Sequence, residues 1–335
     1  MRQPAGLRGF SQLMPLEAPL SSADEPLLRL LEQLDAQGYD FVTATPATHA
    51  RVLRRPGKAL ARDVRDVLGW SLPFRREHIP AQLIELLDAA GVLAQEGELL
   101  KSEVRVSRVR GLLFLHSAYP TDEEDAVFLG PDSYRFASFI AAELAGRSWV
   151  GRLVDVGGGA GVGALTAAAG RGGVQVLITD VNAKALRLAR INAYHARLRV
   201  ETRETAGLED VPEGADLILA NPPYMVDGKA RAYRDGGDMH GAALSLEWAK
   251  TAYAKLAPGG RFLLYTGSAI VDGGQDELRQ ALNVFTEEIG ARLSYRELDP
   301  DVFGEELDKP PYQDVERIAV VGAVITKPRR TPPEN

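Results

Sequence analysis

The feature that most constrains the fold is a short apolar strand that runs into a glycine-rich turn. The strand is 153–156, and glycine follows at positions 157, 158, 159 and 161. A turn built from glycine lets the backbone approach a ligand closely, and the helix after it begins with free N–H groups. The sequence therefore predicts a strand–turn–helix unit at the start of a parallel sheet.

Strands and helices keep alternating after this unit. We expect strands at 152–156, 174–179, 199–203, 216–220 and 261–266, with helices at 161–170, 182–197 and 241–257. Such alternation is typical of a parallel sheet covered on both faces. Two final strands, 291–298 and 317–326, have no helix between them and should pair antiparallel. The predicted fold class is α/β, a Rossmann-like parallel sheet with a C-terminal antiparallel hairpin.

The N-terminal part has a different pattern. Helices are expected from the N-cap Asp24 to Gly38 and at 46–54, 58–69 and 80–90. Short strands at 92–94, 99–100 and 104–106 should form a hairpin, with 112–115 as a further strand. This outline predicts a smaller, mostly helical, winged-helix-like domain at 24–120. It follows an arm at 1–23 and precedes a second domain at 126–328 and a tail at 329–335.

The composition excludes several classes of protein. There is no cysteine among the 335 residues, which removes disulfides, thiolate metal sites and thiol nucleophiles. The first 20 residues lack an apolar signal-peptide core, and the longest apolar stretches are too short to span a bilayer. These observations predict a cytoplasmic protein. The net charge of −7 does not favour general nucleic-acid binding, which needs clustered Lys and Arg.

The glycine-rich turn alone fits two adenosine-containing cofactors. Starting at Gly159 the segment matches a dinucleotide fingerprint. Starting at Asp155 it is Asp-x-Gly-x-Gly-x-Gly, which resembles motif I of methyltransferases. Asp180 closes the next strand and could accept hydrogen bonds from ribose hydroxyls in either case. The turn therefore predicts an adenosine-containing cofactor without choosing between the two.

A second motif makes that choice. The apolar strand 216–220 is followed directly by Asn221-Pro222-Pro223-Tyr224, and two prolines cannot continue a parallel ladder. The motif therefore lies at the carboxyl edge of the sheet, where ligands bind. The Asn221 side-chain oxygen and the Pro222 carbonyl could each accept one N–H of a planar NH₂ group, and Tyr224 offers it a flat face. A dehydrogenase has no use for this arrangement, so the motif predicts methyl transfer to nitrogen.

With these residues, positions 128–270 resemble the small-domain N-methyltransferases that carry an (Asn/Asp)-Pro-Pro-(Tyr/Phe) motif. That group includes HemK-type glutamine methyltransferases acting on peptide-release factors, and RNA and DNA adenine-N6 and guanine-N2 methyltransferases. The segment 128–133 resembles the Pro-x-Asp-Thr/Ser stretch that precedes the turn in this family. The resemblance implies the class I methyltransferase fold and S-adenosyl-L-methionine as cofactor. It covers less than half of the chain.

The resemblance also implies a role for each matching residue. Catalysis would rest on Asn221, Pro222, Pro223 and Tyr224. The cofactor would be bound by Asp132, Asp155, Gly157, Gly158, Gly159, Asp180, Asn182, Ala206 and Asn221. Asp132 would in addition cap a helix at 134–145, and Asp155 would serve the cationic amino-acid moiety. The sequence departs from the family at Thr205-Ala206, where an acid or serine is frequent, so adenine recognition there would rest on backbone groups.

Two kinds of macromolecular substrate fit the flanking sequence. The segment 233–241 resembles the Gly-Gly-x-x-Gly stretch of HemK-type enzymes, which favours a glutamine side-chain amide of a translation-related protein. The alternative is an adenine-N6 or guanine-N2 methyltransferase of rRNA or tRNA, with RNA contacts through Arg51, Arg54, Arg55, Lys58 and Arg62. A small-molecule acceptor and a non-catalytic binding module are further alternatives. Asp235, Asp238 and His240 fit a solvated loop better than a metal site, so no metal is expected.

Overall fold

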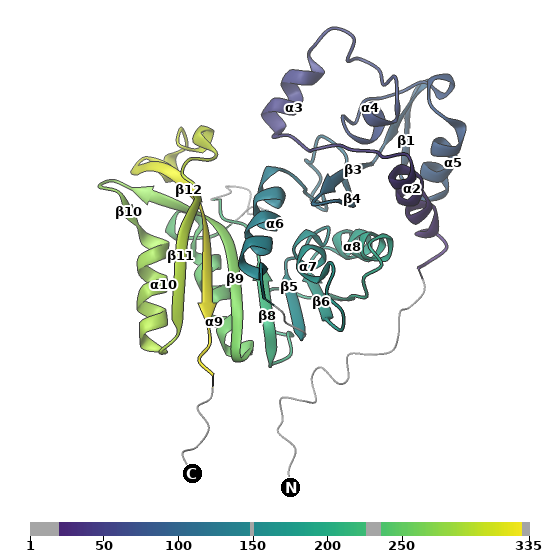
Figure 1. The fold of residues 1–335 in the computed structure, drawn as a ribbon. Coiled ribbons are helices and arrows are strands. Elements are labelled where there is room, and N and C mark those ends of the chain that lie inside the picture. The colour runs from purple at the N-terminus through teal and green to yellow at the C-terminus, as the bar shows by residue number, and fades with distance from the viewer. Residues whose placement is uncertain (1–19, 148–150, 226–235, 330–335) are drawn as a thin grey trace.

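The central sheet of the molecule has the strand order β11-β12-β9-β8-β5-β6-β7 (Figure 1). The structure is a computed structural model that describes residues 20–147, 151–225 and 236–329. The strands are β5 (Arg152–Val156), β6 (Gln175–Asp180), β7 (Glu201–Glu204), β8 (Ala215–Ala220), β9 (Leu256–Val271), β10 (Gln275–Asp276), β11 (Arg292–Asp299) and β12 (Val315–Thr326). Neighbouring strands from β7 to β9 are parallel, whereas β12 is antiparallel to both β9 and β11. The predicted Rossmann-like sheet with its terminal antiparallel hairpin is confirmed.

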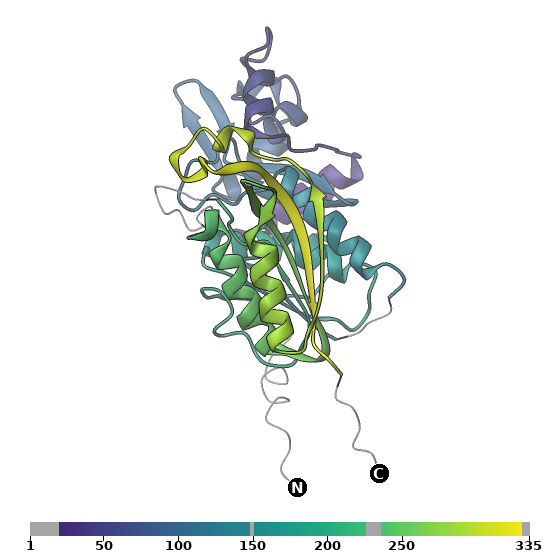
Figure 2. The ribbon, with the colours of Figure 1, turned by 90° about the vertical axis from the view of Figure 1, so that its left-hand side faces the viewer.

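Two helix layers cover this sheet because its central strands are apolar on both faces (Figures 1 and 2). On one face Leu153 and Leu217 pack with α6 (Pro131–Leu144), α7 (Val162–Ala168) and α8 (Ala183–His195). On the other face Val154 and Ile218 pack with α9 (Ala243–Lys255) and α10 (Glu277–Glu288). Helix α10 was not among the predicted elements, although Asp276 caps it by accepting a hydrogen bond from the Arg279 N–H.

The N-terminal part contains four α-helices and two separate hairpins within residues 20–117. Its elements are α2 (Glu25–Ala36), α3 (Pro46–Leu53), α4 (Val64–Leu68), the 3₁₀ turn η2 (Arg76–His78), α5 (Ala81–Ala89), β1 (Leu93–Glu96), β2 (Leu99–Ser102), β3 (Val104–Val109) and β4 (Leu112–Ser117). Strand β1 pairs with β2, as expected for a hairpin over 92–100, but β3 pairs with β4, so the expected inclusion of 104–106 in that first hairpin was wrong. The expected helix at 58–69 is also shorter, because Asp63 caps it by accepting from the Asp66 N–H.

The two parts of the chain share a hydrophobic core. Leu188 and Ile191 of α8 pack with the leucines of α2 and with Leu115 of β4. The fully buried Asn192 adds a polar link. Its Oδ1 accepts from the Leu115 N–H (2.8 Å), and its Nδ2 donates to the carbonyls of Leu115 (3.2 Å) and Ala160 (3.0 Å). One amide thus ties the edge of β4 to the glycine-rich turn.

Short 3₁₀ turns complete the carboxyl edge of the sheet. They are η3 (Met239–Gly241), η4 (Gly304–Glu306) and η5 (Pro310–Tyr312). In Figure 1 the N-terminal part and the loop between β11 and β12 stand at the same end of the sheet as β10. None of the helices in the described ranges is long and apolar enough to cross a membrane.

Candidate functional site

The predicted site residues come together because their strands are neighbours. Strand β5 lies between β6 and β8 and runs parallel to both. The glycine-rich turn, Asp180 and Asn221 each follow the carboxyl end of one of these three strands. Carboxyl ends of parallel strands meet at one edge of the sheet, so the three segments border a common site.

The glycine-rich turn folds back onto β6. Gly157, Gly159 and Gly161 have φ values of +62°, +55° and +84°, a region in which side chains are strained. Gly158 donates its N–H to the Thr179 carbonyl (2.9 Å), and a β-carbon there would lie 2.5 Å from Cγ2 of Ile178. A β-carbon on Gly159 would meet nothing within 4 Å, so this backbone is open to a ligand.

Asp155 lies behind this turn and is almost completely buried. Its Oδ2 accepts from the Ala164 N–H in the first turn of α7 (2.7 Å), and a β-carbon on Gly163 would lie 2.7 Å from the same oxygen. Burial raises the pKa of Asp155 to about 7; the Ala164 bond lowers it and the charge of Asp180 raises it. In this structure the carboxyl holds the turn against α7, and its contact with a cationic ligand group stays a prediction.

The raised pKa of Asp155 predicts a pH-dependent stability. The folded chain keeps a proton that the unfolded chain loses above pH 3.8, so the free energy of unfolding falls as pH rises towards about 7. Asp155→Asn keeps an oxygen that can accept from Ala164 but removes the titration. We expect the wild type to lose about 1–3 kcal/mol more stability than this variant between about pH 4 and about pH 8, measured by urea unfolding. Parallel pH profiles of the two proteins would contradict the assignment.

Asp180 and Asn182 follow β6 and organise the start of α8. Asp180 accepts from the Gly159 N–H (2.8 Å) and the Asn182 N–H (2.9 Å), while burial raises its pKa. Its oxygens retain lone pairs for ribose hydroxyls. The Asn182 side chain caps α8 by accepting from Lys184 and Ala185, and it donates to the Asp125 carbonyl (2.8 Å). A cofactor contact through the Asn182 side chain is therefore less well supported than one through Asp180.

The Asn221–Tyr224 motif leaves the sheet as β8 ends at Ala220. Asn221 is partly exposed, Pro222 is buried, and the Tyr224 ring is 8% exposed. A β-carbon on Gly267 of β9 would lie 2.2 Å from Cδ2 of Tyr224, so one part of the ring rests on that glycine. The ring of Phe303 approaches Tyr224 with a centroid distance of 6.0 Å. Tyr224 is therefore built into the wall of the site rather than standing free in it.

Asp132 fixes the position of the Tyr224 ring. Its two carboxylate oxygens accept from the hydroxyls of Tyr224 (2.6 Å) and Tyr265 (2.9 Å). Burial and the nearby Asp132 charge raise the pKa of both tyrosines, which keeps them protonated as donors. The expectation that Asp132 caps a helix at 134–145 was wrong, because α6 begins at Pro131 with Gly130 as its N-cap. Tyr265 was not predicted, since only the fold brings it to Asp132.

The glycine-rich segment after the motif packs directly on it. Residues 226–235, including Tyr233 and Asp235, lie outside the described residues. The Gly236 N–H donates to the Met225 carbonyl (2.8 Å), and a β-carbon on Gly241 would lie 2.4 Å from the Tyr224 carbonyl oxygen. Small residues are therefore needed here for close backbone contact.

His240 has carboxylate partners other than those considered from the sequence. Its ring nitrogens lie 3.1 Å from Glu277 and 3.1 Å from Asp314. Within the described ranges, no three His, Asp, Glu or Cys side chains are grouped so that they could hold a metal ion.

The loop after β7 borders the site on its far side. The Thr205 N–H donates to the Asp180 carbonyl (3.0 Å), and its hydroxyl donates to Asp210. Ala206 is exposed and brings no polar side chain. The exposed Val181, directly after Asp180, is an apolar residue that the sequence analysis did not single out.

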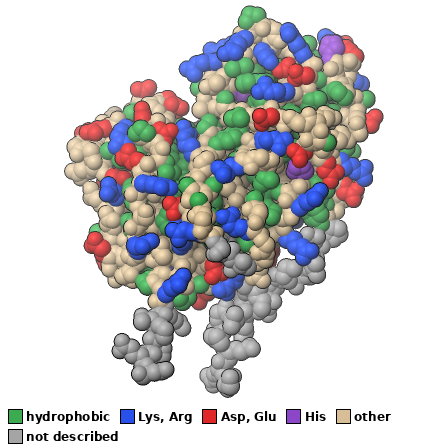
Figure 3. All heavy atoms as spheres, viewed as in Figure 1, with side chains coloured by type: hydrophobic (Ala, Val, Ile, Leu, Met, Phe, Trp, Pro, Cys, Tyr) green, Lys and Arg blue, Asp and Glu red, His purple; other side chains and the backbone are tan. Residues whose placement is uncertain are grey.

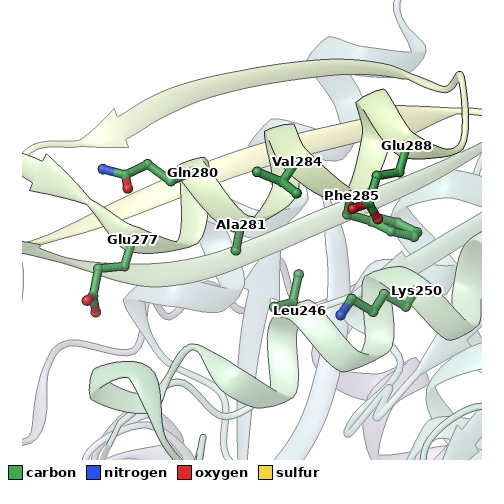
Figure 4. Close-up of a pocket in the computed structure, with 8 residues that line it drawn as sticks. All are labelled: Leu246, Lys250, Glu277, Gln280, Ala281, Val284, Phe285 and Glu288. Atoms are coloured by element: carbon green, nitrogen blue, oxygen red, sulfur yellow. The ribbon is translucent and has the colours of Figure 1, made fainter.

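A groove of about 480 Å³ lies elsewhere, between α9 and α10 (Figure 4). It is lined by Leu246, Lys250, Glu277, Gln280, Ala281, Val284, Phe285 and Glu288. None of the motif residues lines it, so it is separate from the carboxyl-edge site.

Several known proteins are similar to the part of the chain that contains the glycine-rich turn and the Asn221–Tyr224 motif. Residues 136–269 match the family described as Methyltransferase small domain. The chain is 31% identical over 155 residues to the release factor glutamine methyltransferase of Koribacter versatilis, covering 42% of this chain and 55% of the relative. The enzyme of the same name from Cereibacter sphaeroides is 37% identical over 134 residues, covering 35% and 47%. The chain thus spans about half the length of these curated relatives.

A solved S-adenosylmethionine-dependent methyltransferase from Agrobacterium tumefaciens is similar at 16% identity, with a TM-score of 0.45 over 68% of this chain and 71% of that one. The family match covers β5 to β9, which contain the glycine-rich turn and the Asn221–Tyr224 motif. Residues 136–269 thus match a methyltransferase small domain, and they form part of a Rossmann-like sheet that ends in an antiparallel hairpin.

Proposed function

We propose that this protein is an S-adenosyl-L-methionine-dependent N-methyltransferase that acts on a glutamine side-chain amide of a translation-related protein, of the release-factor type. The observation that carries the proposal is the position of Asn221–Tyr224 at the end of β8, beside the glycine-rich turn of β5. The activity also fits the release factor glutamine methyltransferases to which the chain is similar. A cytoplasmic location remains a prediction.

The residues at the carboxyl edge fit the proposed cofactor. A β-carbon at Gly158 would strike Ile178, and the open backbone at Gly159 leaves room for a ligand. Asp180 would accept from the ribose hydroxyls, and the turn 157–159 would lie against the amino-acid part, supported from behind by Asp155. When bound, S-adenosyl-L-methionine supplies a methyl group on a positively charged sulfur. Asp132 would act indirectly, by holding the hydroxyl of Tyr224 in place.

The motif residues would orient the nitrogen that receives the methyl group. The Asn221 Oδ1 and the Pro222 carbonyl each accept one N–H of the amide, so that its lone pair faces the methyl carbon. These acceptors also stabilise the positive charge that develops on the nitrogen as the new N–C bond forms. The amide N–H becomes acidic once methylated and loses its proton to water, so no strong base is needed. Asp132 and Gly267 hold Tyr224 as the wall beside the amide.

The charge around the motif favours a protein over an RNA substrate. The loop between β11 and β12 packs against Tyr224 and Met225 through Phe303, Leu307 and Tyr312. The same loop exposes the carboxylates of Asp301, Glu305, Asp308 and Asp314. Carboxylates next to the acceptor site repel a phosphate backbone, whereas a polypeptide carries no such charge.

An RNA substrate is the second candidate, and one observation favours it. Arg51, Arg54, Arg55 and Arg62 are exposed on and after α3. Figure 3 shows Lys and Arg side chains gathered over this end of the N-terminal part. Lys58, from the same run, is instead paired with Asp66 (2.5 Å). Adenine-N6 or guanine-N2 methylation of rRNA or tRNA would use these arginines as phosphate contacts.

Transfer of labelled methyl groups separates the two substrates. The full chain is incubated with methyl-labelled S-adenosyl-L-methionine and either a purified release factor or total RNA. We expect label on the protein, sensitive to protease and resistant to ribonuclease, with the added methyl on a glutamine by peptide mass spectrometry. Label on RNA, lost in an Arg54→Glu/Arg55→Glu variant, would replace the protein substrate by the RNA candidate. Cofactor binding without any transfer would leave only the non-catalytic binding module.

A further inference from the structure

Trp248 of α9 lies between two loops of the carboxyl-edge site. A β-carbon on Gly157, after β5, would lie 3.2 Å from Cη2 of the indole. A β-carbon on Gly207, after β7, would lie 3.3 Å from its Nε1. Both glycines have positive φ, of +62° and +56°. The indole therefore spans the distance from the glycine-rich turn to the loop that carries Ala206.

The indole has the exposure and the chemistry of a ligand-binding group. It is only partly buried, although it packs on the hydrophobic cluster of the α9 face. Its N–H has no hydrogen-bond acceptor among the residues that the structure describes. A buried indole N–H usually has a hydrogen-bond partner, so an unused indole donor at the edge of this site is suited to an acceptor atom of a ligand.

The loop after β7 offers no side-chain donor for the purine ring of a cofactor. Ala206 is exposed and non-polar, and the Thr205 hydroxyl is already bonded to Asp210. Neither side chain of this pair can donate to a purine ring nitrogen from its present position. The free N–H of Trp248 lies next to Gly207 and is a donor from a different element of the fold.

We propose that Trp248 forms the purine end of the cofactor pocket. Its ring would lie against the adenine, and its N–H would donate to a ring nitrogen, replacing the polar side chain that Ala206 lacks. This inference rests on the proposed function, since it assigns a part of the same cofactor site. Trp248 is thus a cofactor-binding residue contributed by α9 rather than by a loop after a strand.

Calorimetry with S-adenosylhomocysteine tests the assignment on the full chain. We expect Trp248→Ala to raise the dissociation constant about ten- to a hundred-fold, the range found when an aromatic ring that stacks on a base is removed. Trp248→Phe keeps a ring but loses the N–H, so a smaller increase is expected. Leu246→Ala is the matched control, because Leu246 is on the same helix but lines the groove between α9 and α10 (Figure 4).

Two further readouts separate binding from packing. In a Trp70→Phe/Trp149→Phe background, the fluorescence of Trp248 should change when S-adenosylhomocysteine binds. In turnover, Trp248→Phe should raise KM for S-adenosyl-L-methionine while kcat at saturation stays near the wild-type value.

The outcomes for this inference and for the proposed function are distinct. A wild-type chain that binds no S-adenosylhomocysteine would overturn the proposed function. A wild type that binds it, together with unchanged affinity in both Trp248 variants and a silent Trp248 fluorescence, would overturn the role of Trp248 alone. If Trp248→Ala fails to fold, Trp248→Phe is judged by calorimetry and by turnover, and the fluorescence is read in the protein that keeps Trp248.

Discussion

Asn221→Ala is expected to remove methyl transfer while the chain still binds the cofactor through its other site residues. The substitution deletes the side-chain oxygen that would accept one amide N–H, so the acceptor nitrogen is no longer oriented. Loss of one such pre-positioned polar group lowers kcat by about a hundred- to a thousand-fold. Because Asn221 is partly exposed at the end of β8, the fold should be unaffected. Initial rates of methyl transfer and calorimetry with S-adenosylhomocysteine measure the two effects separately.

Two variants make the Asn221 experiment specific. Asn221→Asp keeps an acceptor oxygen and should retain more activity than Asn221→Ala. Asn283→Ala, at an exposed position of α10, is the control for removing an asparagine side chain. Turnover of Asn221→Ala at the wild-type rate would refute the assigned role, whatever its affinity for the cofactor.

Gly267→Ala is expected to abolish the proposed methyl transfer by adding a single methyl group. The new β-carbon would lie 2.2 Å from Cδ2 of Tyr224, so the ring must move away and its hydroxyl must leave Asp132. We expect at least about a hundred-fold lower kcat, as for other displacements of an active-site wall. Overpacking should also lower the free energy of unfolding by about 1–3 kcal/mol. Turnover and urea unfolding provide both numbers.

The stability effect can be assigned to one pair of residues. In a Tyr224→Ala background, Gly267→Ala should lose most of its destabilisation, because the atom that it strikes is gone. Gly304→Ala is the matched control, since a β-carbon there meets nothing within 4 Å. If Gly267→Ala lowers the free energy of unfolding equally in the wild type and in the Tyr224→Ala background, the added methyl group disturbs the strand itself and not the Tyr224 ring.

Most of the sheet could be predicted because its strands are apolar runs with clear ends. Strand β5 ends directly before Gly157, and β8 ends directly before Asn221-Pro222. The first and last residues of both strands were predicted to within one residue. The short strands β1 to β4 were harder, since their pairing depends on which hairpin turns form. Helix α10 was not predicted although Leu278, Leu282 and Phe285 have helical spacing, because the segment 267–290 was assigned to no element.

The site could be predicted as a set of segments but not as a set of contacts. Motif spacing places Asp180 and Asn221 at one edge, since the carboxyl ends of parallel strands coincide. The bonds of Asp132 to Tyr224 and Tyr265 join residues 92 and 133 positions apart. Pairs so distant in the chain leave no local pattern, and the same holds for the indole of Trp248 between its two glycines.

The amide of Asn192 limits how the two parts of this chain can be recombined. Three hydrogen bonds from one buried side chain connect β4 to the Ala160 carbonyl beside the glycine-rich turn. An N-terminal part taken from another protein would leave this amide without its two hydrogen bonds to Leu115, unless it brought a strand edge of matching register. Exchanging the N-terminal part therefore requires a strand edge that fits Asn192, so this part and the segment around the glycine-rich turn have to be changed together.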